Sequence, residues 1–265
     1  MSGFSADWLA LREPADHASI NAAVRAACVR AFAGRDMVRI VDLGCGTGSN
    51  LRSLAPALGG RQHWSLIDND PALLEIAAST AVLEGVEIAC KRADLASADF
   101  GPLLSGADLV TASALFDLFS VEAIERLVGA VATGRCAFYT VLTYDGIAAF
   151  LPEHSADGAM RETFNQHQRR DKGFGPAAGP TASDALAAAF ERHGYSVLRG
   201  KSPWVLDDRQ RELRRELERG WAAAVRETGL VPPATIDEWL AHRDAAEPAV
   251  TIIGHEDLLA LPPTA

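Results

Sequence analysis

Short apolar runs alternate with segments of helical spacing along most of the chain. Five runs have the length and composition of buried strands: 37–44, 63–70, 86–94, 107–116 and 136–146. Between them, residues 47–58, 71–85 and 121–133 have helical spacing, and Pro71 stands at a favoured first position of its helix. Such alternation is typical of a parallel sheet with helices on both faces. The pattern therefore predicts an α/β, doubly wound fold.

Two segments stand apart from this alternation. Residues 1–36 are expected to form an N-terminal helical cap. Within it, Asp16 is expected to be the N-cap residue of a helix that starts near His17. Residues 147–182 are polar and contain several Gly and Pro residues. We expect them to form an insertion after the fifth strand that acts as a lid.

Beyond the insertion, the pattern predicts a helix at 183–194, a strand at 195–206 and two helices at 207–228 and 235–245. These two helices form a helical elaboration over residues 207–246. The final apolar run, 249–261, is expected to be an antiparallel strand that completes a mainly parallel, seven-stranded sheet. Because no internal repeat or long linker is found, residues 1–265 are expected to form a single domain.

Composition and charge narrow the range of partners. The net charge of −10 argues against a nucleic-acid partner, which would require an excess of Lys and Arg on one face. The four cysteines include no CxxC pair, so neither a zinc site nor a disulfide frame is predicted. The charged N-terminus is unlike a signal peptide, and no apolar run has membrane-spanning length. We expect a cytoplasmic monomer or homodimer without a membrane partner, and the spacing of the histidines predicts no metal site.

The stretch IVDLGCGTGSNL, residues 40–51, packs three glycines between a predicted strand and a predicted helix. A phosphate-binding P-loop would need a Lys followed by Ser or Thr, whereas Ser49 and Asn50 follow Gly48. The dinucleotide fingerprint is GxGxxG, and the GxGxG spacing here is one residue short of it. A P-loop is therefore excluded, and a nicotinamide dinucleotide is a poor fit.

The segment VDLGCGTGSN instead resembles motif I of the class I S-adenosylmethionine (SAM)-dependent methyltransferases. In that family an acidic residue at the end of the second strand binds the ribose hydroxyls, and Asp68 occupies this place. An Asp after the third strand often lies beside the adenine, where Asp94 stands, and ADLVTASALFDL is similar to the fourth-strand motif. The resemblance covers about residues 37–146.

The resemblance implies SAM as cofactor and a set of cofactor-binding residues: Arg12, Asp42, Gly44, Cys45, Gly46, Gly48, Asn50, Asp68, Asn69, Asp94, Leu95, Ala112 and Ser113. Each has a purely structural alternative. Asp68 could cap the helix that begins at Pro71, and Arg12 could form a surface ion pair with Glu13 or Asp16 instead of binding the methionyl carboxylate.

The acceptor side of the site is predicted from three polar stretches. Asp117 follows the fourth strand, Tyr144 follows the fifth, and His167 lies in the insertion; these are the candidate catalytic residues. Asp117 could instead cap a helix that begins near Ser120. Tyr144 could instead belong to a turn at Gly146.

The third stretch, residues 164–172, is a polar block within the insertion. Its candidate substrate-binding residues are Asn165, Gln168, Arg169, Arg170 and Lys172. If these residues bind the acceptor, its groups are negatively charged or rich in carbonyl oxygens. A solvated helix face is the alternative.

The sequence thus predicts a SAM-dependent methyltransferase that acts on an oxygen or nitrogen of a small-molecule acceptor, anionic or polar. A nicotinamide-dependent oxidoreductase and a non-catalytic SAM-binding protein are the alternatives.

Overall fold

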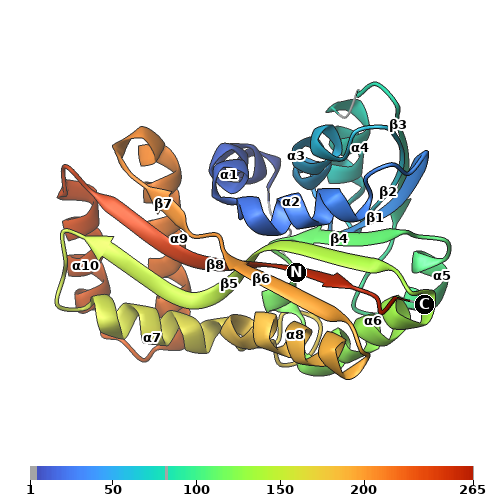
Figure 1. Cartoon of the computed structure of the whole chain (residues 1–265). Helices are drawn as coiled ribbons and strands as arrows, with labels where there is room; N and C mark the ends of the chain where they lie inside the picture. The colour runs from blue at the N-terminus through green and yellow to red at the C-terminus, as the bar shows by residue number, and fades with distance from the viewer. Residues whose placement is uncertain (1–4, 81–82, 265) are drawn as a thin grey trace.

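A computed structural model describes residues 5–80 and 83–264 (Figure 1). Residues 1–4 of the predicted cap, residues 81–82 of the predicted helix 71–85 and residue 265 of the predicted domain lie outside the described residues. One sheet runs through the molecule with helices on both faces (Figure 1). Its strands are β1 (Met37–Leu43), β2 (Arg61–Asp68), β3 (Val86–Arg92), β4 (Leu109–Ser113), β5 (Ala137–Leu151), β6 (Ser196–Lys201), β7 (Trp204–Leu206) and β8 (Val250–Leu261).

The strand order is β3-β2-β1-β4-β5-β8-β6, with β7 paired to β8 outside this path. The pairs formed among β1 to β5 are all parallel, whereas β8 is antiparallel to β5, β6 and β7. The order reverses between β1 and β4, which leaves a crevice at the carboxyl ends of these strands. The predicted doubly wound sheet with an antiparallel last strand is confirmed.

The eighth strand arises because the predicted strand 195–206 is interrupted. Lys201 pairs with Glu256 and Trp204 with Ile253, so β6 and β7 follow β8 in one continuous register. Pro203 separates the two strands, because its nitrogen carries no hydrogen for the ladder. The path of the sheet has the seven predicted strands, and β7 is an additional strand that pairs with β8 outside this path.

Helices cover the two faces of the sheet in two groups (Figure 1). On one face lie α1 (Ala6–Ser19), α2 (Ala22–Ala31), α3 (Ser49–Leu58) and α4 (Pro71–Thr80), and on the other α5 (Phe100–Leu104), α6 (Val121–Gly134) and α8 (Ala182–Arg192). Each group packs on the sheet through its own apolar cluster. Three short 3-10 helices lie in the connections: η1 (Phe116–Leu118), η2 (Gly179–Thr181) and η3 (Asp208–Gln210).

Beyond the central sheet, β5, β7 and the start of β8 form an arm, at the left of Figure 1. β5 runs to Leu151, so the first residues of the predicted insertion 147–182 are strand. The helices α7 (Asp157–Gln168), α9 (Arg211–Thr228) and α10 (Pro233–Ala245) pack against the arm. The Phe150 ring lies 5.4 Å from that of Trp221 and 5.2 Å from that of Trp239. The insertion and the C-terminal helices therefore share one aromatic core.

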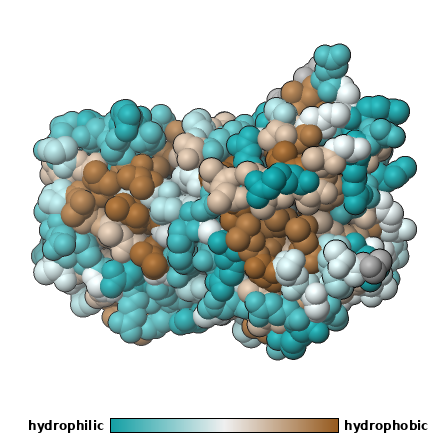
Figure 2. Space-filling view, viewed as in Figure 1, coloured by the Kyte–Doolittle hydropathy of each residue, from teal (hydrophilic) through white to brown (hydrophobic). Residues whose placement is uncertain are grey.

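The opposite face of the arm is apolar and open to solvent. Alternation along the strands leaves Ile147, Leu151 and Val205 54%, 47% and 56% exposed, whereas Phe150 and Trp204 are buried. Figure 2 shows the corresponding apolar patch at the left of the view.

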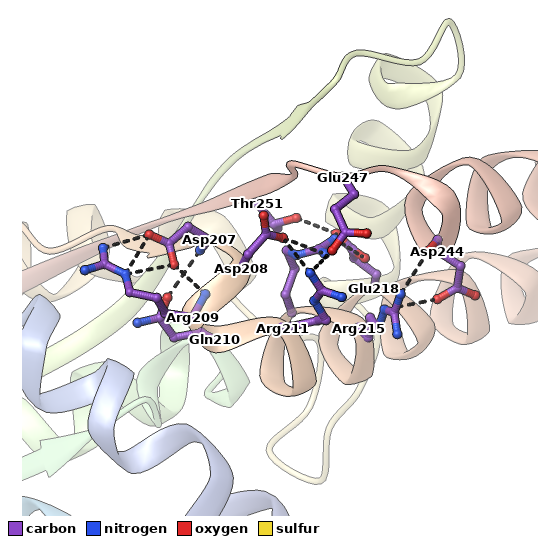
Figure 3. A network of polar contacts seen from close by, with 11 residues as sticks. Asp207, Asp208, Arg209, Gln210, Arg211, Arg215, Glu218, Asp244, Glu247 and Thr251 are labelled. Carbon is purple, nitrogen blue, oxygen red and sulfur yellow. Dashed lines mark hydrogen bonds and ion pairs between the residues drawn. The ribbon is translucent and has the colours of Figure 1, made fainter.

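Polar contacts fasten the arm helices at their ends (Figure 3). Arg211 contacts Glu247 beyond α10, and Arg215 donates to the carbonyl oxygen of Asp244 at 3.0 Å. Thr251 of β8 donates to the buried Glu218 of α9 at 2.5 Å. No helix within the described residues is long and apolar enough to cross a membrane.

The N-terminal helical cap contains two helices instead of the predicted one. The prediction that Asp16 is the N-cap residue of a helix is wrong. Asn21 caps α2, since its side chain accepts hydrogen bonds from the backbone of Ala23 and Val24. Asp16 lies within α1, where it is buried against Arg12 and Trp204. A tertiary partner for Asp16, 188 residues away in the sequence, thus overrides its local capping preference.

Candidate active site

Three glycines with left-handed backbone shape the turn between β1 and α3. Gly44, Gly46 and Gly48 have φ of 62°, 53° and 83°, a region that residues with a Cβ rarely adopt. A Cβ on Gly44 would lie 3.0 Å from Leu115 Cδ1, and one on Gly46 would lie 3.1 Å from Leu9 Cδ1. Glycine therefore preserves both the path of the turn and the space beside it.

This turn borders a cavity of about 490 Å³ at the carboxyl ends of β1, β2 and β4. Its lining residues are Leu9, Arg12, Asp16, Gly44, Cys45, Gly46, Thr47, Ser49, Asn50, Asp68, Asn69, Asp70, Pro71, Leu73, Ala93, Asp94, Leu95, Ser113, Ala114, Leu115, Leu118 and Phe174. The structure thus brings together all the predicted cofactor residues except Asp42, Gly48 and Ala112, which do not line the cavity. Binding of SAM by these residues stays a prediction.

Asp42 lies buried behind the glycine turn. Asn50 donates from Nδ2 to Asp42 Oδ1 at 2.8 Å and to Thr111 Oγ1 at 3.0 Å, which ties β1, α3 and β4 together. Burial raises the pKa of Asp42 to about 7, and the negative charge of Asp68 acts in the same direction. Among the described residues, Oδ2 of Asp42 has no hydrogen-bond partner. Asp42 therefore supports the cavity wall and retains one acceptor atom.

Asp68 holds the glycine turn in place from the end of β2. Its Oδ2 accepts a hydrogen bond from the Gly46 amide at 2.8 Å, and its Oδ1 accepts one from the Asp70 amide at 3.0 Å. A carboxylate has further lone pairs, so both oxygens can still accept ligand hydroxyls. The cap of α4 is Asp70, whose Oδ1 accepts from the Ala72 amide at 2.8 Å. The alternative role of Asp68 as that cap is therefore wrong.

Helix α1 lies over the cavity and is fastened to α3. Glu13 Oε1 accepts from Arg52 Nε at 2.7 Å, and His17 Nε2 lies 3.0 Å from Ser49 Oγ. Arg12 pairs with Asp16 at 2.9 Å and stacks over the Trp204 ring at 4.9 Å. Asp16 is thus the actual ion-pair partner of Arg12, and the pair is part of the cavity wall, not of the outer surface.

Asp117 and Tyr144, two of the predicted catalytic residues, do not line the cavity. Asp117 is on η1, directly before Leu118, which does line the cavity. Burial of the Asp117 carboxyl raises its pKa to about 6, although the cations Arg12 and Lys172 act in the opposite direction. Ser120 caps α6, because its hydroxyl accepts from the Ala123 amide at 3.1 Å. The alternative of Asp117 as the cap is therefore wrong.

Tyr144 lies in β5, which continues past Gly146, so the alternative of a turn there is wrong as well. The Tyr144 hydroxyl donates to Asn165 Oδ1 at 2.7 Å, and Asn165 Nδ2 donates to the Gly146 carbonyl oxygen at 3.0 Å. Burial raises the pKa of Tyr144. This phenol is a fixed hydrogen-bonding group, ill-suited to be a base near neutral pH.

The polar block 164–172 faces α9 more than it faces the cavity. Helix α7 ends at Gln168, so residues 169–172 of the block are not part of a helix face. His167 Nε2 lies 3.0 Å from Glu227 Oε2, and Arg170 donates to the Glu227 carbonyl oxygen at 3.4 Å. Lys172 Nζ lies 3.4 Å from His167 Nδ1. Because both ring nitrogens of His167 have partners, the geometry gives no support to its role as a base.

Gln168 and Arg169 of the block lie next to the start of η2. A Cβ on Gly179 would lie 3.3 Å from Arg169 Cγ and from the backbone of Gln168. Of the whole insertion, Phe174 lines the cavity, and its ring stacks on Phe119 with centroids 4.1 Å apart. The substrate-binding role of the block stays a prediction.

Among the cavity residues that sequence reasoning missed are Leu9, Asp16 and Leu118. The first two come from the N-terminal helix, whose position over the sheet no local pattern reveals. Leu118 could have been found, because it directly follows Asp117 in the fourth-strand motif. Within the described residues, no group of three His, Cys, Asp or Glu side chains could hold a metal ion.

The residues present fit SAM as a ligand. The glycine turn leaves backbone amides and space next to the N-terminus of α3, where a carboxylate is favoured. Asp68 has free acceptor capacity for ribose hydroxyls, and the cavity contains no Lys–Ser or Lys–Thr pair for phosphates.

Comparisons with known proteins agree with this geometry. A family model described as a methyltransferase domain matches residues 40–133. The chain is similar to a cyclopropane-fatty-acyl-phospholipid synthase-like protein from Lactobacillus casei, with 16% identity, a TM-score of 0.53, and coverage of 94% of this chain and 99% of that one. It is also similar to the YcgJ protein from Bacillus subtilis, with 15% identity, a TM-score of 0.50, and coverage of 92% and 100%. At these identities the structural likeness shows the fold alone, and no curated protein matches the chain. The family model thus shows a methyltransferase domain over residues 40–133, and the solved structures show the fold of the chain.

Proposed function

We propose that the chain binds SAM in this cavity and methylates an oxygen or nitrogen of a small-molecule acceptor. The observation that carries the proposal is the continuity of the cavity. It reaches from the glycine turn and Asp68 at one end to Leu118 and Phe174 at the other. The first end has the donors and acceptors that suit SAM, and the second is walled by residues outside the predicted cofactor set.

Groups of both charges would hold SAM at the first end of the cavity. The amides of the glycine turn and the N-terminus of α3 would face the carboxylate of SAM. Asp68 would accept from the ribose hydroxyls, and Asp94, whose Oδ1 accepts from the Ala96 amide at 3.0 Å, would lie beside the adenine. When bound, SAM supplies an electrophilic methyl group.

The chain contributes positioning and exclusion of water. Leu9, Leu118 and Phe174 give the cavity apolar walls, and α1 covers it from above. Holding an acceptor in line with the methyl group supplies a large share of the rate in such a displacement. A base is needed where the acceptor atom starts protonated, and Asp117 is the group that we propose for it.

The proposal of a small, polar acceptor is supported by the cations of the polar block 164–172. His167 and Arg170 contact Glu227, whereas Arg169 and Lys172 are the remaining cations of the block. An acceptor with a long anionic backbone would be repelled by a chain of net charge −10.

Calorimetric titration of the full chain with SAM, S-adenosylhomocysteine (SAH) and NAD tests the cofactor half of the proposal. We expect one site for SAM and for SAH, and no binding of NAD. Release of SAH in the presence of fractionated small-molecule pools tests the acceptor half. Tighter binding of NAD than of SAM would support the oxidoreductase alternative and overturn the proposal.

A further inference from the structure

Arg12 supplies the positive charge of the cavity wall. Among the described residues that line the cavity, it is the one Arg or Lys, and its side chain is 12% exposed. Four aspartates line the same cavity: Asp16, Asp68, Asp70 and Asp94. Because these carboxylates would repel the carboxylate of SAM, Arg12 is the side chain that can offset the repulsion.

Asp16 occupies one edge of the Arg12 guanidinium. Arg12 Nε donates to Asp16 Oδ2 at 2.9 Å, and Nη2 donates to Asp16 Oδ1 at 3.2 Å. A guanidinium has five N–H donors in a planar fork. Nη1 of Arg12 has no hydrogen-bond partner within the part of the chain that the structure describes. The ion pair thus fixes one edge of the guanidinium and leaves donors unused on the other.

Trp204 of β7 supports this ion pair from the arm. Its Nε1 donates to Asp16 Oδ1 at 3.0 Å, and the guanidinium carbon of Arg12 lies over its ring, 4.9 Å from the centroid. Trp204 is 2% exposed and does not line the cavity. Asp16 Oδ1 therefore accepts from the indole as well as from Arg12, so the carboxylate neutralises less of the guanidinium charge.

The residue behind Trp204 adds no second positive charge. The Trp204 ring packs against that of His255, with centroids 5.3 Å apart. Burial and the neighbouring Arg12 lower the pKa of His255 to about 3, so its ring is neutral near pH 7. Arg12 is therefore not repelled from this side.

The part of α1 that carries Arg12 lies over the glycine turn. Leu9, one helical turn before Arg12, is 3.1 Å from the position of a Cβ on Gly46. Glu13, the residue after Arg12, accepts from Arg52 Nε of α3 at 2.7 Å. Arg12 is thus held next to the end of the cavity at which the carboxylate of SAM would bind.

We propose that Trp204 and Asp16 are positioning residues, which hold the Arg12 guanidinium with its unused donors toward the carboxylate of SAM. This inference rests on the proposed function. It makes β7 of the arm part of the cofactor site, although Trp204 does not line the cavity.

Placement of the guanidinium before SAM binds strengthens binding, because a free arginine side chain loses rotamer freedom when a ligand immobilises it. Asp16 also permits the burial of Arg12, since a buried charge without a partner is unfavourable. Trp204 keeps the pair in one geometry through its hydrogen bond and its stacked ring. Loss of Trp204 should therefore weaken binding of the carboxylate and leave binding of the rest of the ligand unchanged.

Calorimetry of the full chain with SAH and with decarboxylated SAH tests the inference, because the second ligand keeps the amine and lacks only the carboxylate. The wild type should bind SAH roughly 10- to 100-fold more tightly than decarboxylated SAH. Arg12→Met should lower this preference roughly tenfold or more.

Trp204→Phe keeps an aromatic ring and removes the N–H donor to Asp16. It should weaken SAH binding roughly three- to tenfold and change the affinity for decarboxylated SAH by less than about twofold. In the Arg12→Met background the same substitution should change SAH affinity by less than about twofold, since the residue that Trp204 positions is gone. Trp239→Phe is the matched control. Its Nε1 donates to Asp157 Oδ1 at 2.7 Å within the arm, and the variant should bind both ligands as the wild type does.

Equal weakening of SAH and decarboxylated SAH in Trp204→Phe would show a general structural role for Trp204 and overturn the inference. An SAH affinity that is unchanged in Trp204→Phe, or that falls by the same factor with and without Arg12, would overturn it as well. A wild type that binds no SAH at all would overturn the proposed function itself, so the two failures are distinguishable.

Discussion

Replacement of Asp68 by alanine tests how the cofactor end of the cavity works. The carboxylate accepts from the Gly46 amide at 2.8 Å and from the Asp70 amide at 3.0 Å, and in the proposed complex it also accepts from the ribose hydroxyls. Hydrogen bonds to a charged group contribute about 1.5–3 kcal/mol each. Because the variant loses ribose contacts and loosens the glycine turn together, we expect SAM affinity to fall by about 2–4 kcal/mol, or roughly 30- to 700-fold in Kd.

Calorimetry with SAH and its 2′-deoxy analogue separates these two effects. In the wild type, removal of the ribose hydroxyl should weaken binding roughly tenfold, whereas in Asp68→Ala the two ligands should bind equally. Asp99→Ala is the control, because Asp99 caps α5 through the Gly101 amide and does not line the cavity. An equal penalty for the analogue in the wild type and in Asp68→Ala would refute the ribose assignment. Unchanged SAH affinity in the variant would refute the whole account of Asp68.

Three further predictions concern the frame of the site. Gly46→Ala should weaken SAH binding by about 1–2 kcal/mol in calorimetry, because φ is 53° and the new Cβ would lie 3.1 Å from Leu9; unaltered binding would show that the turn adapts. Burial raises the folded-state pKa of Asp42 to about 7 from 3.8, so the native state keeps a proton that the unfolded state has lost, and wild-type stability should fall as pH rises through this window. Urea unfolding across the window should show a flatter profile for Asp42→Asn, and an identical slope would contradict this reasoning. Phe164→Ala removes a buried ring stacked 3.9 Å from that of Trp221 and should cost about 3–5 kcal/mol of unfolding free energy, whereas a loss below about 1 kcal/mol would show that the insertion is not part of the core.

The sequence predicts the sheet well because its information is local. Apolar runs bounded by turns identify β1 to β5, and the glycines at 44, 46 and 48 have to stand where a strand passes into a helix. Pro203 also signals the break between β6 and β7, since proline cannot donate a hydrogen bond to the ladder. Local chemistry thus predicts the part of the cavity wall that the glycine turn forms.

The rest of the cavity depends on contacts between distant segments, which periodicity does not encode. Arg12 is joined to Asp16 and Trp204 because α1 packs over β7, and nothing in the N-terminal sequence reveals this. The polar block 164–172 suggested an acceptor site because it is rich in cations. The structure shows that Glu227, on a helix more than fifty residues later, contacts both His167 and Arg170. Composition identified the charges, but their partners are set by tertiary packing.

Amide hydrogen exchange of the full chain with and without SAH tests the central claim most directly, because it reports both binding and location. We predict slower exchange in residues 44–50 and 66–70 and in the covering helix α1, with the arm helices α9 and α10 unchanged. Protection confined to another part of the chain, or no change at saturating SAH, would contradict the assignment of this cavity as the SAM site.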